Sequence, residues 1–250
     1  MSNSNIPRSH PRYLSLNTRE KISEAMKKGL VHETGLIAHG RGEAFDYLIG
    51  EETQVFADNS SKVAAAMLIN ADKPIISVNG NVVALSAKEI VSLSEIIPAK
   101  IEINLFHRTE KRMNLLKKEL ESNGAKNVLG LQADAKIPGL DHDRGLCESN
   151  GIFSADVILV PLEDGDRCKA LRNMGKKVIV IDLNPLSRSA KTADITIVDN
   201  IIRAIPNIEK WVKNLKNKTF EELSTIIGCW DNDKNLKDSM ELISNRLKRV

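Results

Sequence analysis

The sequence predicts an α/β protein built on a parallel sheet of about six strands, preceded by a helical region and followed by further helices. Three observations indicate this fold class. Short runs rich in Val and Ile are bounded by turn residues, which is typical of buried parallel strands. These runs alternate with segments of helical period, which implies right-handed βαβ crossovers. The chain has 250 residues, of which 42% are hydrophobic, enough to bury a substantial core.

Residues 1–73 are predicted to form a polar arm and a helical region packed on the core. Residues 1–17 lack any regular period, and Asn17 with Glu20 has the pattern of a capping box that starts a helix ending at Gly29. A second helical region over 33–49 is expected to be interrupted at 38–43, because two glycines inside a helix cost about 1 kcal/mol each relative to alanine. A third helix is predicted over 59–70.

Residues 74–206 are predicted to form the nucleotide-binding core, and residues 207–250 a set of C-terminal helices. Strands are expected at 75–78, 101–106, 128–131, 157–160, 178–181 and 195–198, with helices at 87–97, 110–122 and 167–174 and another starting near 201. Helices are expected at 209–215, 220–227 and from 233 onward. The polar segment 136–151 breaks the alternation and is predicted to be an ordered functional loop or a lid.

Composition excludes several classes of function. The 36 basic and 33 acidic residues leave a net charge of +3, and aromatic residues make up 4%, which argues against a dedicated nucleic-acid surface. No apolar run approaches the length needed to span a membrane, and the start of the chain has no signal-peptide core. Three widely spaced cysteines indicate free thiols in a reducing cytoplasm rather than a zinc site.

Polar residues follow the last two predicted strands. Asp182 to Asn184 end one strand, Ser187 to Ser189 follow them, and Asp199 with Asn200 ends the next strand. Ligands of open α/β sheets bind beyond the carboxyl ends of strands, so these residues define a candidate nucleotide cleft. A carboxylate can accept from ribose hydroxyls, while Arg188, Ser189 and free amides suit phosphate. Ordinary turn chemistry explains the same residues about equally well.

Further candidates lie outside that stretch. The glycines that flank Arg41 allow close approach of a ligand, and His39 and Glu43 beside them favour a functional element over simple helix packing. Arg19 lies in the first turn of its predicted helix, where a cation is unfavourable unless an anion binds there, although a lone surface arginine commonly has no role. Other polar residues follow strands and should face the same edge: Asn79, Asn81, His107 and Arg108.

Two chemical signatures are weak or absent. Residues 163–166, Glu-Asp-Gly-Asp, could orient Mg²⁺ or an amine, with solvated helix capping as an equal alternative. No glycine-rich phosphate loop of the Walker or dinucleotide type follows any strand, which weakens a nicotinamide-dehydrogenase interpretation.

The assembled segments resemble the archaeal phosphopantothenate synthetase family, the 4-phosphopantoate–β-alanine ligases. The resemblance covers nearly the whole chain apart from its last forty-odd residues and is carried by 6–20, 35–51, 77–85, 105–112, 154–167 and 178–206. It implies a homodimeric, Rossmann-like three-layer fold in the cytoplasm and a step of coenzyme A biosynthesis. ATP, 4-phosphopantoate and β-alanine would give 4′-phosphopantothenate, AMP and pyrophosphate with Mg²⁺ present, through an acyl adenylate.

The resemblance also implies site residues. The ATP-binding positions would be Arg19, Arg41, Asp182, Leu183, Asn184, Arg188, Ser189, Asp199, Asn200, Ile201 and Ile202. Our own hypothesis assigns Arg19, Arg41 and Arg188 to the ATP phosphates, and Asp182 or Asp199 to the nucleoside. Arg41 and His39 are the catalytic candidates, and His39, Asn79, Asn81 and Arg108 are candidates for binding phosphopantoate. Neither the metal ligands nor the base that deprotonates β-alanine can be assigned from the sequence.

Two other classes of function remain as alternatives. The parallel sheet is compatible with a nicotinamide-dependent oxidoreductase, which cofactor turnover at 340 nm would reveal. A non-catalytic nucleotide-sensing protein would bind ATP and release no product.

Overall fold

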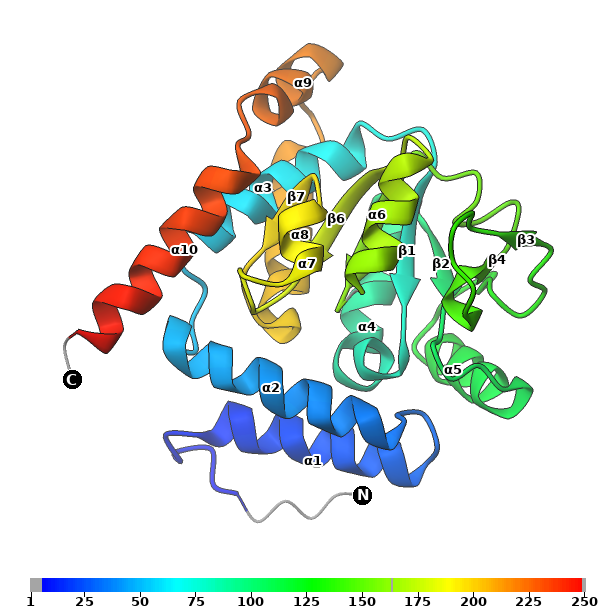
Figure 1. The fold of residues 1–250 in the computed structure, drawn as a ribbon, viewed down its shortest axis with the longest axis horizontal. Helices are drawn as coiled ribbons and strands as arrows, with labels where there is room; N and C mark the ends of the chain where they lie inside the picture. The colour runs from blue at the N-terminus through cyan, green and yellow to red at the C-terminus, as the bar shows by residue number, and fades with distance from the viewer. Residues whose placement is uncertain (1–5, 163, 249–250) are drawn as a thin grey trace.

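A parallel five-stranded sheet forms the centre of the protein in the computed structural model, which describes residues 6–162 and 164–248 (Figure 1). Its strands are β1 (Pro74–Val78), β2 (Lys100–Ile103), β5 (Val157–Pro161), β6 (Lys177–Ile181) and β7 (Ile195–Ile197), in the order β2-β1-β5-β6-β7. Nearly every residue of these strands is buried, as the continuous apolar runs require when both faces are covered. The predicted α/β class is confirmed.

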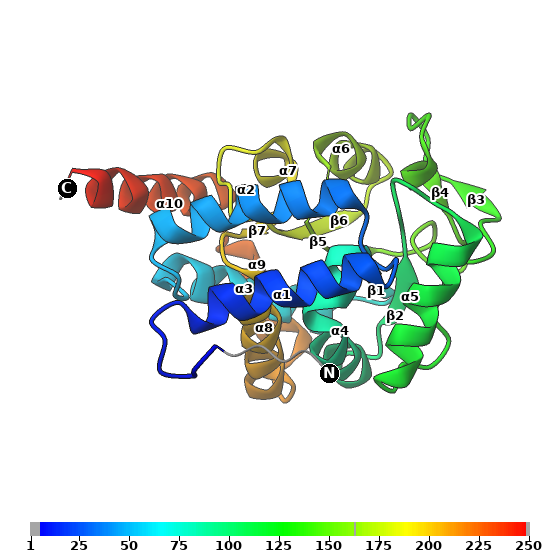
Figure 2. The same cartoon turned by 90° about the horizontal axis from the view of Figure 1, so that it is seen from below.

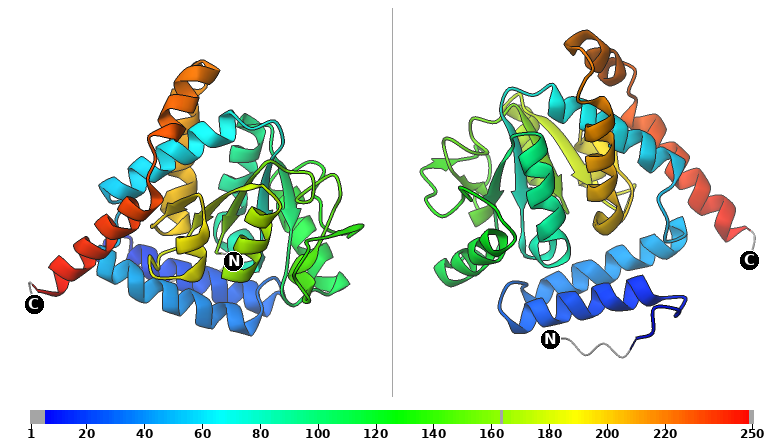
Figure 3. Two further views of the ribbon diagram at one scale, coloured as in Figure 1. Left: turned by 45° about the horizontal axis from the view of Figure 1, so that its top comes forward. Right: turned by 180° about the vertical axis from the view of Figure 1, so that it is seen from behind.

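Helices cover both faces of the sheet, which gives the expected three layers (Figures 1 and 3). The helices α4 (Gly80–Ile96) and α8 (Ile201–Leu215) pack against each other on one face, and α3 (Val55–Ile69) packs on α8 beside β7. The helices α6 (Gly165–Asn173) and α7 (Arg188–Thr192) lie on the other face. Side chains alternate accordingly, with Ile179 and Ile181 in the larger core and Val178 and Val180 in the smaller one.

Two antiparallel helices lie side by side across the carboxyl ends of the strands (Figures 1 and 2). They are α1 (Tyr13–Lys27) and α2 (Glu33–Ile49), and both contact α4. Ile22 and Ala25 of α1 are buried in the larger core. The N-terminal helical region therefore covers the edge of the sheet where ligands of such folds bind.

The remaining elements lie at the two sides of the sheet. The helix α5 (Glu110–Ser122) flanks β2, and α9 (Phe220–Gly228) and α10 (Asn232–Leu247) end the described chain. The segment 136–151 is ordered, as predicted. Together with Ala135 it forms the short ribbon of β3 (Ala135–Lys136) and β4 (Leu146–Cys147), with a 3₁₀ turn at Asp143–Gly145. Ile137, Leu140 and Cys147 anchor this polar segment in the smaller core.

The expected sixth strand, at 128–131, is wrong. Leu129 makes one parallel bridge to Glu102 at the edge of the sheet, and the chain then leaves it. Asn127 and Gly130 have positive φ angles of 56° and 107°, which the extended backbone of a strand does not allow. A Cβ atom at Gly130 would lie 2.2 Å from the Ile103 carbonyl oxygen, so only glycine permits this close crossing.

Several predicted helix boundaries are also wrong. The helix α1 starts four residues before Asn17, so the Asn17–Glu20 pair lies inside it and caps nothing. The helix α2 runs without a break through Gly40 and Gly42. The helix α4 starts at Gly80 rather than near 87, with the Asn79 side chain accepting from the Val82 amide, and α8 continues through Pro206. The predicted helix over 110–122 is confirmed, capped by Thr109.

Candidate active site

A cavity of about 510 Å³ lies between α2 and the carboxyl ends of the strands. It is lined by α2, by the residues that follow β1, β2, β5, β6 and β7, and by Arg144 from the ribbon segment. The sequence predicts nucleotide-binding residues beside β6 and β7 and acid-binding residues beside β1 and β2. We therefore refer to the first part as the nucleotide half and to the second as the acid half. The cavity thus lies at the carboxyl edge of the sheet, where the sequence predicts a candidate cleft.

In the nucleotide half, the Asp182 carboxylate organises the turn that follows β6. It accepts from the Asn184 amide at 2.9 Å and from the Ser187 and Ser189 hydroxyls, so the carboxylate fixes the start of α7. Burial raises the pKa of Asp182, and the hydrogen bonds from these groups oppose that rise. Arg188 projects from the same turn, is 70% exposed at its side chain, and pairs with Asp166.

Asp199, unlike Asp182, is paired with an arginine in addition to its hydrogen bonds. Its Oδ2 accepts from Thr53 Oγ1 at 2.6 Å, and its Oδ1 accepts from the Asn200 amide at 2.7 Å and from Arg203 Nε at 2.8 Å. Arg203 also pairs with Asp46 of α2 at 2.5 Å. Burial raises the pKa of Asp199, while Arg203 acts in the opposite direction. This buried ion triad ties α2 to the first turn of α8.

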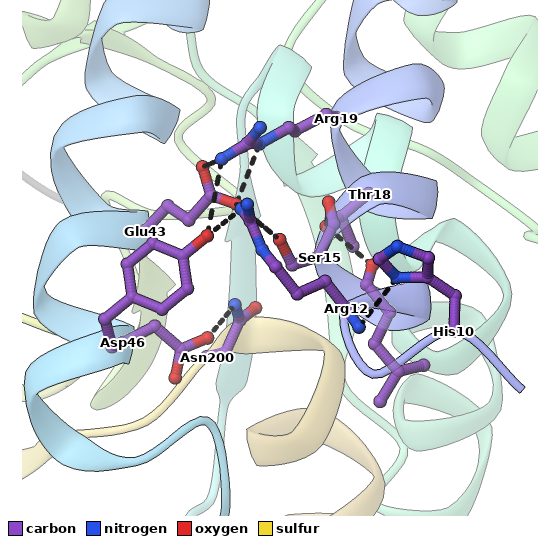
Figure 4. Close-up of polar contacts among 10 residues, drawn as sticks. His10, Arg12, Ser15, Thr18, Arg19, Glu43, Asp46 and Asn200 are labelled. Carbon is purple, nitrogen blue, oxygen red and sulfur yellow. Dashed lines mark hydrogen bonds and ion pairs between the residues drawn. The ribbon is translucent and has the colours of Figure 1, made fainter. Parts of the chain in front are cut away.

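Arg19 reaches the site through Glu43 (Figure 4). Its guanidinium donates from Nε to both Glu43 oxygens, at 2.8 and 2.9 Å, and Ser15 donates to the same carboxylate at 2.7 Å. Burial favours the neutral acid, but the hydrogen bonds from Arg19 and Ser15 lower the pKa of Glu43 overall. Glu43 lines the cavity and Arg19 does not, so Arg19 lies behind Glu43 in this arrangement.

The acid half is lined by polar side chains of a different kind. Asn79 Nδ2 donates to the Leu162 carbonyl at 3.3 Å, and Asn81 Nδ2 donates to the Gly35 carbonyl at 2.9 Å. His32 and His107 stack at a centroid distance of 3.9 Å. Leu162, at the end of β5 between the two halves, has a φ of 58°, which is strained for a branched residue and is of the kind found at functional sites.

Arginines also reach the acid half. Arg112 of α5 lines it with a half-buried side chain, and the almost completely buried Arg144 lies 3.7 Å from Asp164. Other parts of the chain hold the Arg112 guanidinium and the backbone of Arg144. Arg112 donates to the His107 and Leu30 carbonyls. Asn104 Nδ2 donates to the carbonyls of Arg144 and Leu146, which holds the backbone at and after Arg144.

The cavity brings together most of the residues that the sequence singled out. Those that line it are His39, Arg41, Asn79, Asn81, Asp182, Leu183, Asn184, Arg188, Ser189, Asp199, Asn200 and Ile201. Three others are not among its lining residues: Arg19, Ile202 and Arg108. Arg108 Nη2 instead donates to the carbonyls of Gly130 and Leu131, which holds the segment beside the edge of the sheet.

His39 of α2 lines the cavity and has a half-buried imidazole. Burial lowers its pKa, although the nearby Glu43 raises it. Its Nε2 is buried without a hydrogen-bond partner among the described residues. The imidazole is therefore kept neutral near the cavity at neutral pH.

Sequence reasoning missed Arg112 and Arg144. Arg112 lies inside an amphipathic helix and resembles any solvated arginine, and Arg144 lies in a segment whose path the sequence does not reveal. A signal was nevertheless present in the ribbon segment, because a long polar insertion between strands is uncommon unless it is functional.

Neither a metal cluster nor a membrane span is evident in the described parts of the chain. No group of three or more His, Cys, Asp or Glu side chains there is arranged to hold a metal ion. Of the predicted 163–166 cluster, Glu163 lies outside the described residues, and Asp164 and Asp166 pair with Arg144 and Arg188. None of the described helices is both long and apolar enough to cross a bilayer.

Comparison with known proteins places the chain in a family. A family model described as phosphopantothenate/pantothenate synthetase matches residues 56–246. The chain is 53% identical over 247 residues to the 4-phosphopantoate–β-alanine ligase of Thermococcus kodakarensis, covering 98% of this chain and 95% of the relative. It is 50% identical over 245 residues to the enzyme of that name from Methanosarcina mazei, covering 98% and 96%. The chain therefore belongs to the phosphopantothenate/pantothenate synthetase family.

Proposed function

We propose that this protein is an ATP-dependent ligase that condenses 4-phosphopantoate with β-alanine to give 4′-phosphopantothenate, AMP and pyrophosphate in coenzyme A biosynthesis. The observation that carries the proposal is the two-part cavity of about 510 Å³, polar at both halves, in a chain whose relatives of 50–53% identity are named for this reaction. Its size suits a nucleotide and a small acid side by side.

The chemistry explains why such a cavity needs many cations. A carboxylate is a poor electrophile, so one of its oxygens attacks the α-phosphorus of ATP, the bond to the β-phosphate oxygen breaks, and pyrophosphate leaves. The amine of β-alanine then attacks the acyl carbon, AMP departs with the former carboxylate oxygen, and the amine loses a proton. Both partners of the first step are anions, and fixed cations offset their repulsion and stabilise the charge on the pentavalent phosphorus.

In this proposal, each half has its own residues. Arg41 and Arg188 bind ATP phosphates, and Asp182, which accepts from an amide and two hydroxyls whereas Asp199 is paired with Arg203, accepts from the nucleoside. Arg19 acts through Glu43, which it holds at the cavity wall. His39, Asn79 and Asn81 face the acid substrate, and Arg108 supports the edge of the acid half from behind.

Mg²⁺ would accompany the nucleotide. Protein sites for nucleotide-bound Mg²⁺ need only one or two carboxylates, the phosphates and waters supplying the other ligands. Asp164 lines the cavity between its two halves, and its exposed carboxylate fits that role. The ion would offset phosphate charge there.

We further propose that the protein acts as a homodimer, as the family resemblance implies. Arg41 lines the cavity of its own chain. Sedimentation equilibrium gives the test: a mass of twice the 27.7 kDa chain is expected, and a single-chain mass would refute the dimer.

The decisive experiment identifies the nucleotide product. The protein is mixed with ATP, Mg²⁺, 4-phosphopantoate and β-alanine, with each omitted in turn, and AMP is resolved from ADP. AMP formed only in the complete mixture supports the ligase and the adenylate route. ADP would retain the ligase but replace the adenylate with an acyl phosphate. ATP binding without turnover would favour the nucleotide-sensing alternative.

A further inference from the structure

The Arg112 guanidinium lies at the start of α4, on the wall of the acid half. Its Nη1 donates to the His107 carbonyl at 2.6 Å and its Nη2 to the Leu30 carbonyl at 3.1 Å. The contact with α4 is close, because a Cβ atom at Gly80 would lie 3.2 Å from Nη2 and 2.4 Å from the Leu30 oxygen. The loop between α1 and α2 thus holds the guanidinium against the first residue of α4.

The charge of Arg112 has no counter-ion in the described residues. No described carboxylate oxygen lies within 4 Å of its nitrogens, and its partners are two neutral carbonyls. Its Nε is buried with no hydrogen-bond partner among these residues. Burial lowers the pKa of Arg112, with no acid acting in the other direction. By contrast, Arg203, which contacts the nucleotide half through Asp199, is paired with two carboxylates.

The Arg112 guanidinium lies beside another positive group, the N-terminus of α4. The amides of the first turn of α4 give that end of the helix a partial positive charge, and α4 has no acidic residue in its first turn. A guanidinium beside it adds a second positive charge, partly buried and lined by neutral polar groups such as Asn79 and Asn81. Such an arrangement is stabilised when an anion binds between the two.

We propose that Arg112 binds the phosphate of the acid substrate, and so makes the site selective for the phosphorylated acid over the free hydroxy acid. The inference rests on the proposed ligase function and assigns the acid half within it. ATP phosphates and the substrate phosphate repel each other, and the order β2-β1-β5-β6-β7 places Arg112, beside β2 and β1, on the far side of the cavity from Arg188, beside β6. The carboxylate of the acid then lies between them.

The test compares two ligands that differ only in the phosphate. Isothermal calorimetry measures the affinity of 4-phosphopantoate and of pantoate for the wild type, Arg112→Gln, Arg112→Lys and the control Lys111→Gln, which removes an exposed charge from the adjacent position. We expect Arg112→Gln to lose about 100-fold in affinity for 4-phosphopantoate and to leave pantoate unchanged. Arg112→Lys keeps the charge but not the bidentate geometry, so its affinity for 4-phosphopantoate should lie between those of the wild type and Arg112→Gln.

The outcomes separate this inference from the proposed function. If both Arg112 variants keep the wild-type preference for the phosphorylated ligand, or if the wild type has none, the inference is wrong. Equal losses of affinity for both ligands would indicate a structural role for Arg112 and would also overturn the inference. If Arg112→Gln does not fold, the same comparison is made with Arg112→Lys. The ligase itself is judged by AMP formation in the wild type, which this binding measurement does not involve.

Discussion

The two halves of the cavity hold their charges in opposite ways. In the nucleotide half, Asp182 and Asp199 accept hydrogen bonds from their own turns, and Arg203 is shared between Asp46 and Asp199. In the acid half, Arg112 is fixed by carbonyl oxygens that carry no net charge. The buried carboxylates of the first half are satisfied within the protein. The second retains net positive charge that a ligand can offset.

The largest expected effect is on the nucleotide half. Arg203→Ala leaves the Asp46 and Asp199 carboxylates, with side-chain exposures of 7% and 1%, buried without their cation. We expect the free energy of unfolding to fall by about 3–5 kcal/mol, measured by urea denaturation. The control Arg172→Ala removes an arginine with a 45% exposed side chain and should cost about 1 kcal/mol or less. Equal losses in the two variants would contradict a special role for the triad.

Glu102, which holds the ribbon segment beside the acid half, should make the free energy of unfolding depend on pH. Glu102 of β2 is buried and accepts from the amides of Glu148 and Ile152, which hold the ribbon segment that carries Arg144. Burial raises the pKa of Glu102 to about 7, against 4.5 for an ordinary glutamate. Because the folded state then binds the proton more tightly than the unfolded state, Glu102 lowers stability as the pH rises from about 4.5 to about 7.

Glu102→Gln should remove that part of the pH dependence. The glutamine side chain cannot ionise, so a fall in the free energy of unfolding of at most about 3 kcal/mol between pH 5 and pH 7 disappears in the variant. One amide hydrogen bond is also lost, at all pH values. Urea midpoints across this range measure it. Parallel curves for wild type and variant would show that Glu102 does not titrate there.

An intermediate effect is expected at the edge of the nucleotide half. Arg188→Ala removes an exposed guanidinium from the cavity wall, and we expect the KM for ATP to rise about tenfold with the KM for 4-phosphopantoate unchanged. Lys191→Ala, on the same short helix but outside the cavity lining, is the matched control. Steady-state kinetics with each substrate varied gives the answer, and an unchanged KM for ATP would remove Arg188 from the nucleotide site.

The smallest expected effect is at Gly40 of α2, the helix that lies over the cavity. A Cβ atom at Gly40 would meet nothing within 4 Å, and Gly40 is exposed inside the continuous helix α2. Gly40→Ala should therefore raise the free energy of unfolding by about 0.5–1 kcal/mol without changing the KM for ATP. Denaturant melts and kinetics together test this. A higher KM for ATP would mean that a ligand approaches the backbone at Gly40, as the flanking glycines suggested.

Five of the six expected strands and the helix over 110–122 were predictable because local pattern and tertiary packing agree there. The start of α1 was not, because residues 13–17 gain their contacts from α2: Ser15 donates to Glu43, 28 residues away. The strand-end residues of the site followed from the geometry of parallel sheets. Arg112 did not, since its position depends on the Leu30 carbonyl, 82 residues distant.

The alkylation rates of the three cysteines can report how often the fold opens. Cys229 is exposed, whereas Cys168 and Cys147 are buried, and burial raises the pKa of the Cys147 thiol to about 12. Thiolates are the species that react with alkylating reagents, so the native chain should label at Cys229 alone. Cys147 lies in β4, on the ribbon segment that carries Arg144. The slow labelling of Cys147 then reports how often that segment detaches, in the unmodified protein and with ligands present or absent.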